Sequence, residues 1–368
     1  MTSPPLTPTP EPAPWWRAGP VSLHVGDAHE VLAALPDASV DCIVTSPPYW
    51  GLRSYDTGRW NGGRADCGHD AAPSRAGPHQ PRTCPACEAV WTDGQYGQEP
   101  TIGEYVDRLV AVFDQARRVL HPHGTVWLNL GDSYAGTGPR TARPHGTRSV
   151  IGGNYNHRQW TPGAVAGLPA KNLIGIPWRV ALALQANKWI LRNAAVWAKT
   201  NGQPSSARDR LTTTYEMVFL LTRSPRYYFD LDAIRIPLKN PHDRRLRTST
   251  GSRPGPGGHR ARDTDPTRPR GKNPGDVWPY PTRALKEAHF AAYPIEIPLR
   301  CIAAGCRPEG VVLDPFSGAA TTGLAALHLG RSYIGVDLSS QYAAIAKRRL
   351  LSHWPDLEDP PRQDGPCR

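Results

Sequence analysis

Long apolar runs are missing from this 368-residue chain. No stretch approaches the ~18 consecutive apolar residues that a transmembrane helix needs. The first residues, MTSPPLTPTPEPAPWW, are rich in proline and lack the basic region and apolar core of a secretion signal. We therefore expect a protein that has no membrane partner and is not secreted.

Cysteine is also scarce. The seven cysteines are odd in number and irregularly spaced, which argues against a disulfide framework and favours the reducing cytoplasm, where thiols can bind metal. The 40 prolines and 35 glycines make up about 20% of the chain, below the roughly 25–30% typical of low-complexity disorder. With 39% hydrophobic residues, the chain can bury the core of one large domain or two modest ones.

Negative charge is in shorter supply than positive charge. The 32 Asp and Glu residues face 43 Lys and Arg residues, which gives a net charge of +11. Residues 235–275 hold eleven basic residues and three aspartates, so this stretch alone carries +8. A polyanion such as nucleic acid is the natural partner of such a segment, although a solvated basic loop without a ligand would have the same composition.

Short apolar runs alternate with helical patterns through most of the chain. Order is expected to begin at Val21, after a disordered proline-rich arm at 1–20. The patterns predict strands at 21–25, 40–46, 125–130, 190–199, 215–223, 227–230, 311–315 and 332–337, and helices at 29–35, 104–120, 176–187, 319–329 and 340–351. This alternation indicates an α/β fold with a doubly wound, largely parallel sheet and ligands at the carboxyl ends of its strands.

The first motif with chemical content is VVLDPFSGAATTG at 311–323, a buried strand followed by an acidic turn and a small-residue loop. Gly318 and Gly323 match the outer glycines of a dinucleotide-binding turn, but Ala320 takes the middle place, where glycine lets the backbone approach a pyrophosphate. The loop therefore favours a ligand with adenosine and no phosphate. Asp337, at the end of the next strand, can accept hydrogen bonds from ribose hydroxyls. A tight turn without a ligand remains the alternative.

The second motif is VDCIVTSPPYW at 40–50, a buried strand that runs directly into Ser-Pro-Pro-Tyr. Two successive prolines fix φ and favour extended geometry in the preceding residues, which makes the loop stiff. Such a loop presents the Ser46 hydroxyl, the Pro47 carbonyl and the flat faces of Tyr49 and Trp50, on which a base could stack. An ordinary turn would have the same four residues.

Together these motifs resemble the S-adenosylmethionine-dependent DNA amino-methyltransferases. TSPPYW is similar to their catalytic signature, DPFSGAATT to their methyl-donor loop, and GVDLS to the strand end that holds the donor's ribose. VGDA at 25–28 resembles the turn that contacts adenine, and KEAHFAAYPIEIP at 286–298 resembles the segment around the methionine moiety. The catalytic loop precedes the donor loop, as in the permuted subgroup called beta. Ala319 and Ala320 depart from the family's donor loop, where glycine is common.

The resemblance implies a Rossmann-like methyltransferase fold, S-adenosylmethionine as cofactor, and double-stranded DNA as partner. It divides the chain into a catalytic half at 21–234, a basic target-recognition segment at 235–280, a donor-binding half at 281–352 and a flexible tail at 353–368. The implied catalytic residues are Ser46, Pro47, Pro48 and Tyr49. The implied donor site comprises Asp27, Thr45, His289, Phe290, Pro294, Asp314, Pro315, Phe316, Gly318, Thr321, Asp337 and Leu338. The implied DNA contacts are Arg244, Arg245, Arg247, Arg253, Arg260, Arg262 and Lys272.

Residue 46 bears on the target base. Family members with serine before Pro-Pro-Tyr mostly methylate cytosine N4, and those with Asp or Asn mostly methylate adenine N6, so we expect cytosine, with adenine as the alternative. Ser46 and the Pro47 carbonyl would accept the two amine hydrogens, Tyr49 would stack on the flipped base, and direct displacement would transfer the methyl group. A cytosine C5 enzyme would instead need a nucleophilic cysteine after a proline, and the Cys84-Pro85-Ala86-Cys87 sequence has the spacing of a metal knuckle.

The polar stretch at 51–100 interrupts the α/β pattern and carries a set of soft metal ligands. Cys67, His69, Cys84 and Cys87 have zinc-finger-like spacing, with His79 as an alternative to His69, and Zn²⁺ would supply the stability that a core does not. A flexible loop with reduced thiols is the competing interpretation.

Cys42, Cys301 and Cys306 are predicted to lie in the core. Asn129 and Asp132 could line the base site or cap turns, and Trp197 and Lys199 are expected in the core or at its rim.

We therefore expect a cytoplasmic DNA methyltransferase of a restriction-modification system, monomeric or homodimeric, with a cognate restriction endonuclease as a possible partner. RNA or protein substrates are the nearest rivals, because an Asn-Pro-Pro-Tyr loop of similar shape serves protein glutamine methylation. From a different class, a zinc-containing DNA-binding protein without catalysis would also explain the basic segment and the cysteines.

Overall fold

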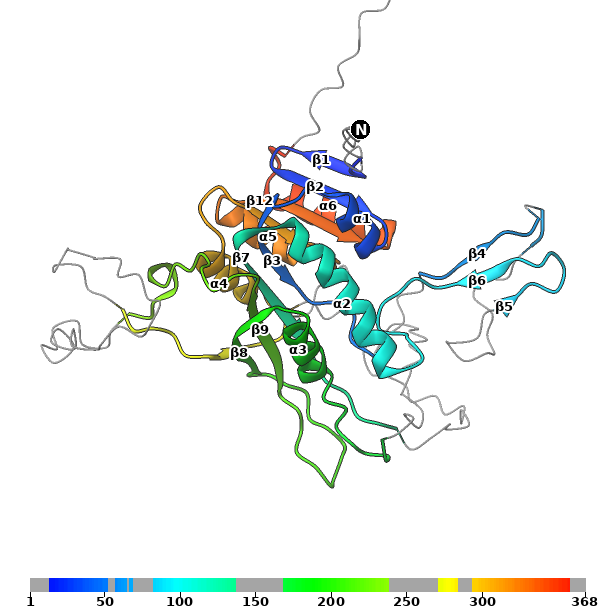
Figure 1. Cartoon of the computed structure of the whole chain (residues 1–368), viewed down its shortest axis with the longest axis horizontal. Helices are drawn as coiled ribbons and strands as arrows, with labels where there is room; N and C mark the ends of the chain where they lie inside the picture. Colours follow the sequence, from blue (N-terminus) through cyan, green and yellow to red (C-terminus); the bar gives the residue numbers. More distant parts are fainter. Residues whose placement is uncertain are drawn as a thin grey trace, which may run out of the picture.

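A nine-stranded sheet forms the centre of the computed structural model (Figure 1). The structure describes residues 13–51, 57–64, 66–68, 82–136, 168–237, 271–283 and 293–357. The strand order is β1-β2-β12-β11-β3-β7-β9-β8-β10. In chain order these strands are β1 (Trp16–Ala18), β2 (Val21–Val25), β3 (Val40–Thr45), β7 (Leu120–Leu130), β8 (Ile190–Lys199), β9 (Tyr215–Thr222), β10 (Val277–Tyr280), β11 (Val311–Asp314) and β12 (Ser332–Asp337).

Most neighbouring strands are parallel. The pairs from β2 through β12, β11 and β3 to β7 are all parallel, and β8 is parallel to β10. Within this sheet, β1 and β9 run against their neighbours. The predicted doubly wound, mostly parallel sheet is thereby confirmed. Strands β3 and β11 are far apart in the chain but adjacent in the sheet, with Leu313 opposite Ile43, so the loops that follow them begin side by side at one edge.

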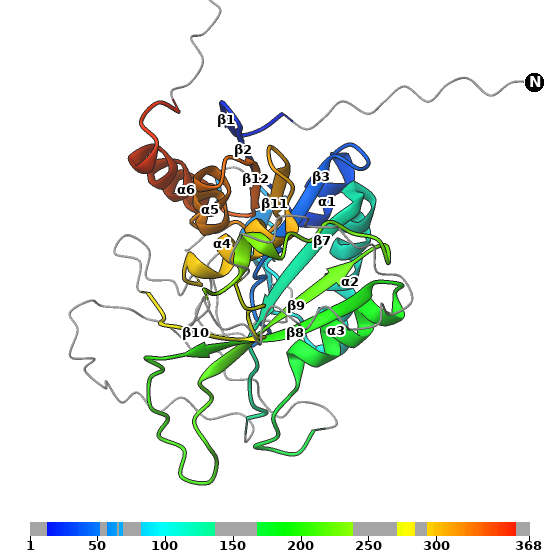
Figure 2. The ribbon, with the colours of Figure 1, turned by 90° about the vertical axis from the view of Figure 1, so that its left-hand side faces the viewer.

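Helices cover both faces of the sheet (Figure 2). One layer contains α1 (Ala28–Ala34), α2 (Ile102–Val119) and α3 (Ile176–Ala186), and the other contains α4 (Glu296–Gly305), α5 (Thr321–His328) and α6 (Ser340–His353). Helix α2 buries the apolar stripe that its sequence predicts, with Tyr105, Leu109 and Phe113 fully enclosed, because residues three and four apart share one helical face. None of the helices in the described ranges is long and apolar enough to span a membrane.

The structure differs from the sequence prediction near the N-terminus and after β9. Strand β1 lies within the predicted disordered arm, and it is ordered because it pairs with β2 and buries Trp16 to 6% exposure. Residues 227–230 were expected to form a strand but do not. Two backbone hydrogen bonds, from Tyr228 N to His123 O and from Asp230 N to Ala304 O, both 2.8 Å, hold them instead, and the short 3₁₀ helix η1 (Asp232–Ile234) follows.

The predicted basic segment includes a strand of the central sheet. Strand β10 falls inside the predicted recognition segment, yet it is an edge strand of the central sheet, where it pairs with β8. Ile236 and Lys272 exchange backbone hydrogen bonds of 2.9 and 2.7 Å, so the chain leaves and returns at the same point. Of the predicted DNA contacts, Lys272 is described, whereas Arg244, Arg245, Arg247, Arg253, Arg260 and Arg262 lie outside the described residues.

The predicted insertion at 51–100 contains a second sheet and part of the main domain. Strands β4 (Arg59–Asn61), β6 (Val90–Thr92) and β5 (Arg82–Thr83) form a small antiparallel sheet that projects from the main body (Figure 1). The rings of Trp60 and Trp91 meet edge to face at 5.5 Å between centroids. The last residues of the predicted insertion belong to the main domain, because Tyr96 and Glu99 are buried there.

Candidate active site

A cavity of about 460 Å³ opens at the carboxyl ends of the parallel strands. Its size falls within the range of small-molecule sites. The cavity lining contains most of the residues predicted for catalysis and donor binding: Asp27, Ser46, Pro47, Pro48, Tyr49, Asp314, Pro315, Phe316, Gly318, Thr321, Asp337 and Leu338. Thr45 and Pro294 are buried and do not belong to the lining, and His289 and Phe290 lie outside the described residues.

The loop after β3 brings Ser46 and Tyr49 to the cavity. Ser46 Oγ lies 3.1 Å from Tyr49 Oη and 3.2 Å from Asn129 Oδ1. The carbonyl end of the Asn129 amide faces both hydroxyls, because its Nδ2 donates to Met217 O at 3.1 Å. Asn129, at the end of β7, therefore lines the predicted base site, one of the two roles that its sequence position left open.

The hydrogen of the Tyr49 hydroxyl can be assigned by distance. Tyr49 Oη has one hydrogen, and its nearest acceptor is Glu216 Oε2 at 2.6 Å, compared with 3.0 Å to Asn129 Oδ1. The Ser46 hydroxyl can then donate its single hydrogen either to Tyr49 Oη at 3.1 Å or to Asn129 Oδ1 at 3.2 Å. With its hydrogen turned toward either of these two groups, Ser46 Oγ has lone pairs available to accept hydrogen bonds from the cavity.

Glu216 is held in turn by Lys199, whose Nζ donates to Oε1 at 2.6 Å. The pair is largely buried, with the side chains of Lys199 and Glu216 exposed by 23% and 12%. Burial, and after it the Glu216 carboxylate, raise the pKa of Tyr49 well above its usual value, so the phenol remains protonated. The chain Lys199–Glu216–Tyr49 thus holds the hydroxyl of Tyr49, which Ser46 also contacts.

Gly131 allows the Tyr49 ring to lie where it does. A Cβ at this position would be 2.5 Å from Tyr49 Cε2 and 2.8 Å from Cδ2, so Gly131→Ala must displace the ring. We expect turnover to fall at least about tenfold, because small misplacements of a catalytic group are costly. The measurement is steady-state kcat together with the melting temperature. Gly103→Ala is the control, since its added Cβ would meet only Thr101 Oγ1 at 3.8 Å. Equal effects of the two substitutions would contradict this role of Gly131.

Asp314 connects the two motif loops. Its Oδ1 accepts from Thr45 Oγ1 at 2.6 Å and from Phe316 N at 3.0 Å, and its Oδ2 accepts from Thr322 Oγ1 at 2.6 Å. Burial raises the pKa of Asp314, while the hydroxyl donors oppose that shift. The carboxylate is therefore engaged within the protein and braces the end of β3 against the loop after β11.

Asp337 ends β12 and faces the same cavity. Its Oδ2 accepts from Gly318 N at 2.9 Å and its Oδ1 from Ser339 N at 2.8 Å. Burial raises the pKa of Asp337 to about 6 despite these two donors. Each carboxylate oxygen has a second lone pair, so Asp337 can still accept hydrogen bonds from a ligand.

Aromatic and acidic groups complete this half of the cavity. Asp27 caps helix α1, because its Oδ1 accepts from His29 N at 2.8 Å, and it also accepts from Tyr96 Oη at 3.3 Å. The rings of Tyr96 and Phe316 meet edge to face, with 5.1 Å between their centroids. Arg108 lies over the Tyr96 ring, with its Cζ 3.8 Å from the ring centroid.

Asp132 combines the two roles that the sequence left open, because it lines the cavity and also caps a helix. Its Oδ1 accepts from the backbone N–H groups of Ser133, Gly175 and Ile176 at 2.9, 3.0 and 3.1 Å, at the start of α3. The carboxylate thus satisfies N–H groups that the first turn of a helix leaves without partners.

Sequence reasoning missed Glu216, Tyr96 and Tyr293 as cavity residues and assigned Lys199 only a core or rim position. Glu216 had a signal, since it is the one charged residue in the apolar strand YEMVFLLT. Tyr96 was assigned to the insertion. Tyr293 Oη lies in hydrogen-bond contact with Thr322 Oγ1, beside Asp314.

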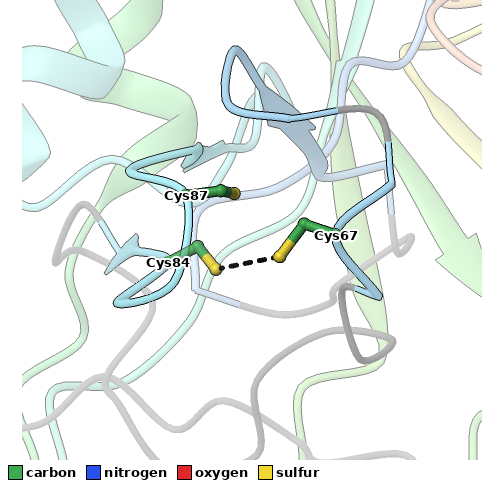
Figure 3. A group of neighbouring side chains, drawn as sticks. All are labelled: Cys67, Cys84 and Cys87. Atoms are coloured by element: carbon green, nitrogen blue, oxygen red, sulfur yellow. Dashed lines mark hydrogen bonds between the residues drawn. The ribbon is translucent and has the colours of Figure 1, made fainter.

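Three of the predicted metal ligands meet in the small sheet (Figure 3). The Sγ atoms of Cys67, Cys84 and Cys87 lie within 4.8 Å of one another, and those of Cys67 and Cys84 are 3.8 Å apart. His69 and its alternative His79 lie outside the described residues. The predicted core cysteines Cys42, Cys301 and Cys306 are buried, as expected.

The sequence of this chain is similar to those of known DNA methyltransferases. A family model for DNA methylases of the N6 and N4 type matches residues 40–348. The type II methyltransferase M.SmaI of Serratia marcescens is 36% identical over 89% of this chain and 90% of its own length. M.Cfr9I of Citrobacter freundii is also 36% identical, over 89% of this chain and 87% of its own.

Solved structures show the same fold. The PvuII DNA methyltransferase, described as cytosine-N4-specific, superposes with a TM-score of 0.56 at 16% identity, covering 92% of this chain and 89% of that one. A protein from Thermus thermophilus, solved with S-adenosyl-L-methionine, gives a TM-score of 0.50 at 21% identity, covering 90% of this chain and 94% of that one.

Proposed function

The chain belongs to the DNA methylase family of S-adenosylmethionine-dependent N6 and N4 amino-methyltransferases, and from this membership we propose that it methylates cytosine N4 in double-stranded DNA. It would act within a short recognition sequence as the modification enzyme of a type II system with a cognate restriction endonuclease. The observation that carries the base assignment is Ser46, whose Oγ lies at the cavity within hydrogen-bond distance of Tyr49 Oη and Asn129 Oδ1.

The cavity suits the cofactor. Asp337 offers buried acceptor lone pairs for two ribose hydroxyls, and Phe316 and Tyr96 offer aromatic surface beside them. Asp27 lies at the same rim, where the family resemblance implies contact with adenine. When bound, S-adenosylmethionine supplies an electrophilic methyl group on a sulfonium.

The protein's own contribution is to localise and aim a poor nucleophile. The lone pair of cytosine N4 is delocalised into the ring. Ser46 Oγ and the Pro47 carbonyl would accept the two amine hydrogens and draw the nitrogen toward sp³ geometry. Tyr49, held by Glu216 and Lys199, would provide a fixed face for the flipped base. Alignment of this kind lowers the barrier without a covalent enzyme intermediate.

The proposal is tested by methyl transfer from tritiated S-adenosylmethionine to duplex DNA of mixed sequence, followed by digestion and separation of nucleosides. We expect label in N4-methylcytosine, and single-molecule sequencing of DNA from expressing cells should report the recognition motif. Label in N6-methyladenine would overturn the base assignment. If no DNA or RNA becomes labelled while duplex is still bound, the protein is a binding module.

We also propose that the small sheet binds Zn²⁺ through Cys67, Cys84 and Cys87, with His69 predicted as the fourth ligand. Four tetrahedral ligands with Zn–S bonds of about 2.3 Å place two sulfurs about 3.8 Å apart. The Cys67 and Cys84 sulfurs are separated by 3.8 Å. The metal would stabilise a sheet whose strands are only two or three residues long.

The zinc proposal predicts one equivalent of Zn²⁺ per purified chain, measured by plasma mass spectrometry. Cys84→Ser should lower the zinc content sharply because it removes a ligand, whereas Cys367→Ser, which alters a cysteine of the tail, should not. A fully folded protein that contains no metal would contradict the proposal.

A further inference from the structure

The loop between β8 and β9, residues 200–214, starts and ends at the rim of the cavity. Lys199 and Thr213, just before and near the end of this loop, both line the cavity. Strand β8 is antiparallel to β9, which is antiparallel to β7, so β8 runs in the same direction as β7 and β3. The loop therefore projects from the same edge as Ser46, and Figure 2 shows it extending beyond the sheet.

Leu211 lies at the exposed part of this loop. Its side chain is 90% exposed, more than any other large hydrophobic side chain in the described residues. Thr213 is only two residues away, so the Cα atoms of the two residues are within about 7 Å of each other. Because its side chain is exposed, Leu211 contributes no hydrophobic stabilisation to the fold. Burial against a bound partner would supply that free energy.

The residues around Leu211 are tied down while its own side chain points outward. Arg210 Cζ lies 3.9 Å from the centroid of the Tyr134 ring, and Asp209 pairs with Lys171 at 2.6 Å. Within the loop, Ser205 N donates to Thr212 Oγ1 at 3.3 Å. The loop thus presents an apolar side chain from a fixed backbone, which reduces the ordering cost on binding.

The charge around Leu211 suits a nucleic acid. Arg208 and Arg210 both precede it in the chain and are exposed, and the charge of Asp209 is offset by Lys171. Arginines next to an apolar tip can contact phosphates while the tip meets the base stack.

We propose that Leu211 is a wedge that enters the DNA duplex beside the target base and fills part of the space that the flipped base leaves. Apolar side chains, leucine among them, insert between base steps in other protein–DNA complexes and offset the cost of unstacking. The inference rests on the proposed methylation of a flipped base, and it adds the residue that opens the duplex.

The test uses the mapped recognition site in two duplexes, one fully paired and one with an abasic site opposite the target cytosine. Leu211→Ala should lower the single-turnover methylation rate of the paired duplex at least about tenfold. On the second duplex, where the base is already unpaired, the rate of the variant should be close to that of the wild-type protein. Leu211→Met, which keeps a long apolar side chain, should retain most of the activity. Leu182→Ala is the matched control, because Leu182 is 54% exposed on α3.

An equal loss on both duplexes, or no loss on either, would overturn the wedge while the wild-type activity upholds the proposed function. If the wild-type protein itself methylates neither duplex, the proposed function fails and this inference fails with it.

Discussion

Replacement of Ser46 by alanine is expected to lower turnover about 100-fold while the affinity for S-adenosylmethionine stays unchanged. A preorganised polar group that acts on the reacting atom typically contributes a factor of this size. Ser46 Oγ is one of two acceptors proposed for the amine hydrogens, and it belongs to the cluster with Tyr49 and Asn129. The remaining contacts of Tyr49 to Glu216 do not involve Ser46, so the loop should keep its geometry.

Single-turnover methylation and calorimetric titration with the cofactor separate the two effects for Ser46→Ala. Ser352→Ala, on the exposed surface of α6, is the control for loss of a serine hydroxyl. A drop in cofactor affinity as large as the drop in rate would contradict the assigned role, because it would place Ser46 in the donor half of the cavity.

The two motif loops were predictable because each follows a strand with a strong sequence signal. VDCIVT is buried at every position, and the prolines after it leave few backbone conformations. The carboxyl ends of parallel strands meet at one edge of a sheet, so the adjacency of these loops followed from the fold class.

Cavity residues that do not belong to the loops after parallel strands were harder to predict. Glu216 begins an antiparallel strand, and only the pairing of β9 between β7 and β8 brings its amino end to the carboxyl edge of the others. Tyr96 follows the small sheet, where composition gave no sign that the chain had rejoined the main domain. Strand β1 was missed because three residues carry little periodicity, and its order depends on pairing with β2.

The structure also shows how the two halves of the site are joined. Thr45 immediately precedes the loop after β3, and its hydroxyl donates at 2.6 Å to Asp314, at the start of the loop after β11. Thr322, in the first turn of α5, donates its hydroxyl hydrogen to the other oxygen of Asp314 at 2.6 Å, and its Oγ1 lies 3.2 Å from Val44 O. Because these bonds are buried, a shift of either loop would leave a polar group unsatisfied, so the spacing between the two loops is fixed.

Asp337 gives the second large effect, a dependence of cofactor affinity on pH. Burial raises the pKa of Asp337 to about 6. Ribose hydroxyls are donors that favour the carboxylate, so binding opposes protonation, and affinity must fall as the pH drops through about 6. At pH 5 roughly ten free proteins carry the proton for each one that does not, which predicts about a tenfold weaker apparent affinity than at pH 7.

Asp337→Asn is expected to weaken cofactor binding about 100-fold at pH 7, since hydrogen bonds to a charged group contribute about 1.5–3 kcal/mol each. It should also remove the pH dependence between pH 5 and 7, because no carboxylate remains to titrate at that position. Calorimetric titration at several pH values measures both effects, with Asp356→Asn, an exposed aspartate after α6, as the control. A pH dependence that persists in Asp337→Asn would assign the titration to another group and remove Asp337 from the ribose site.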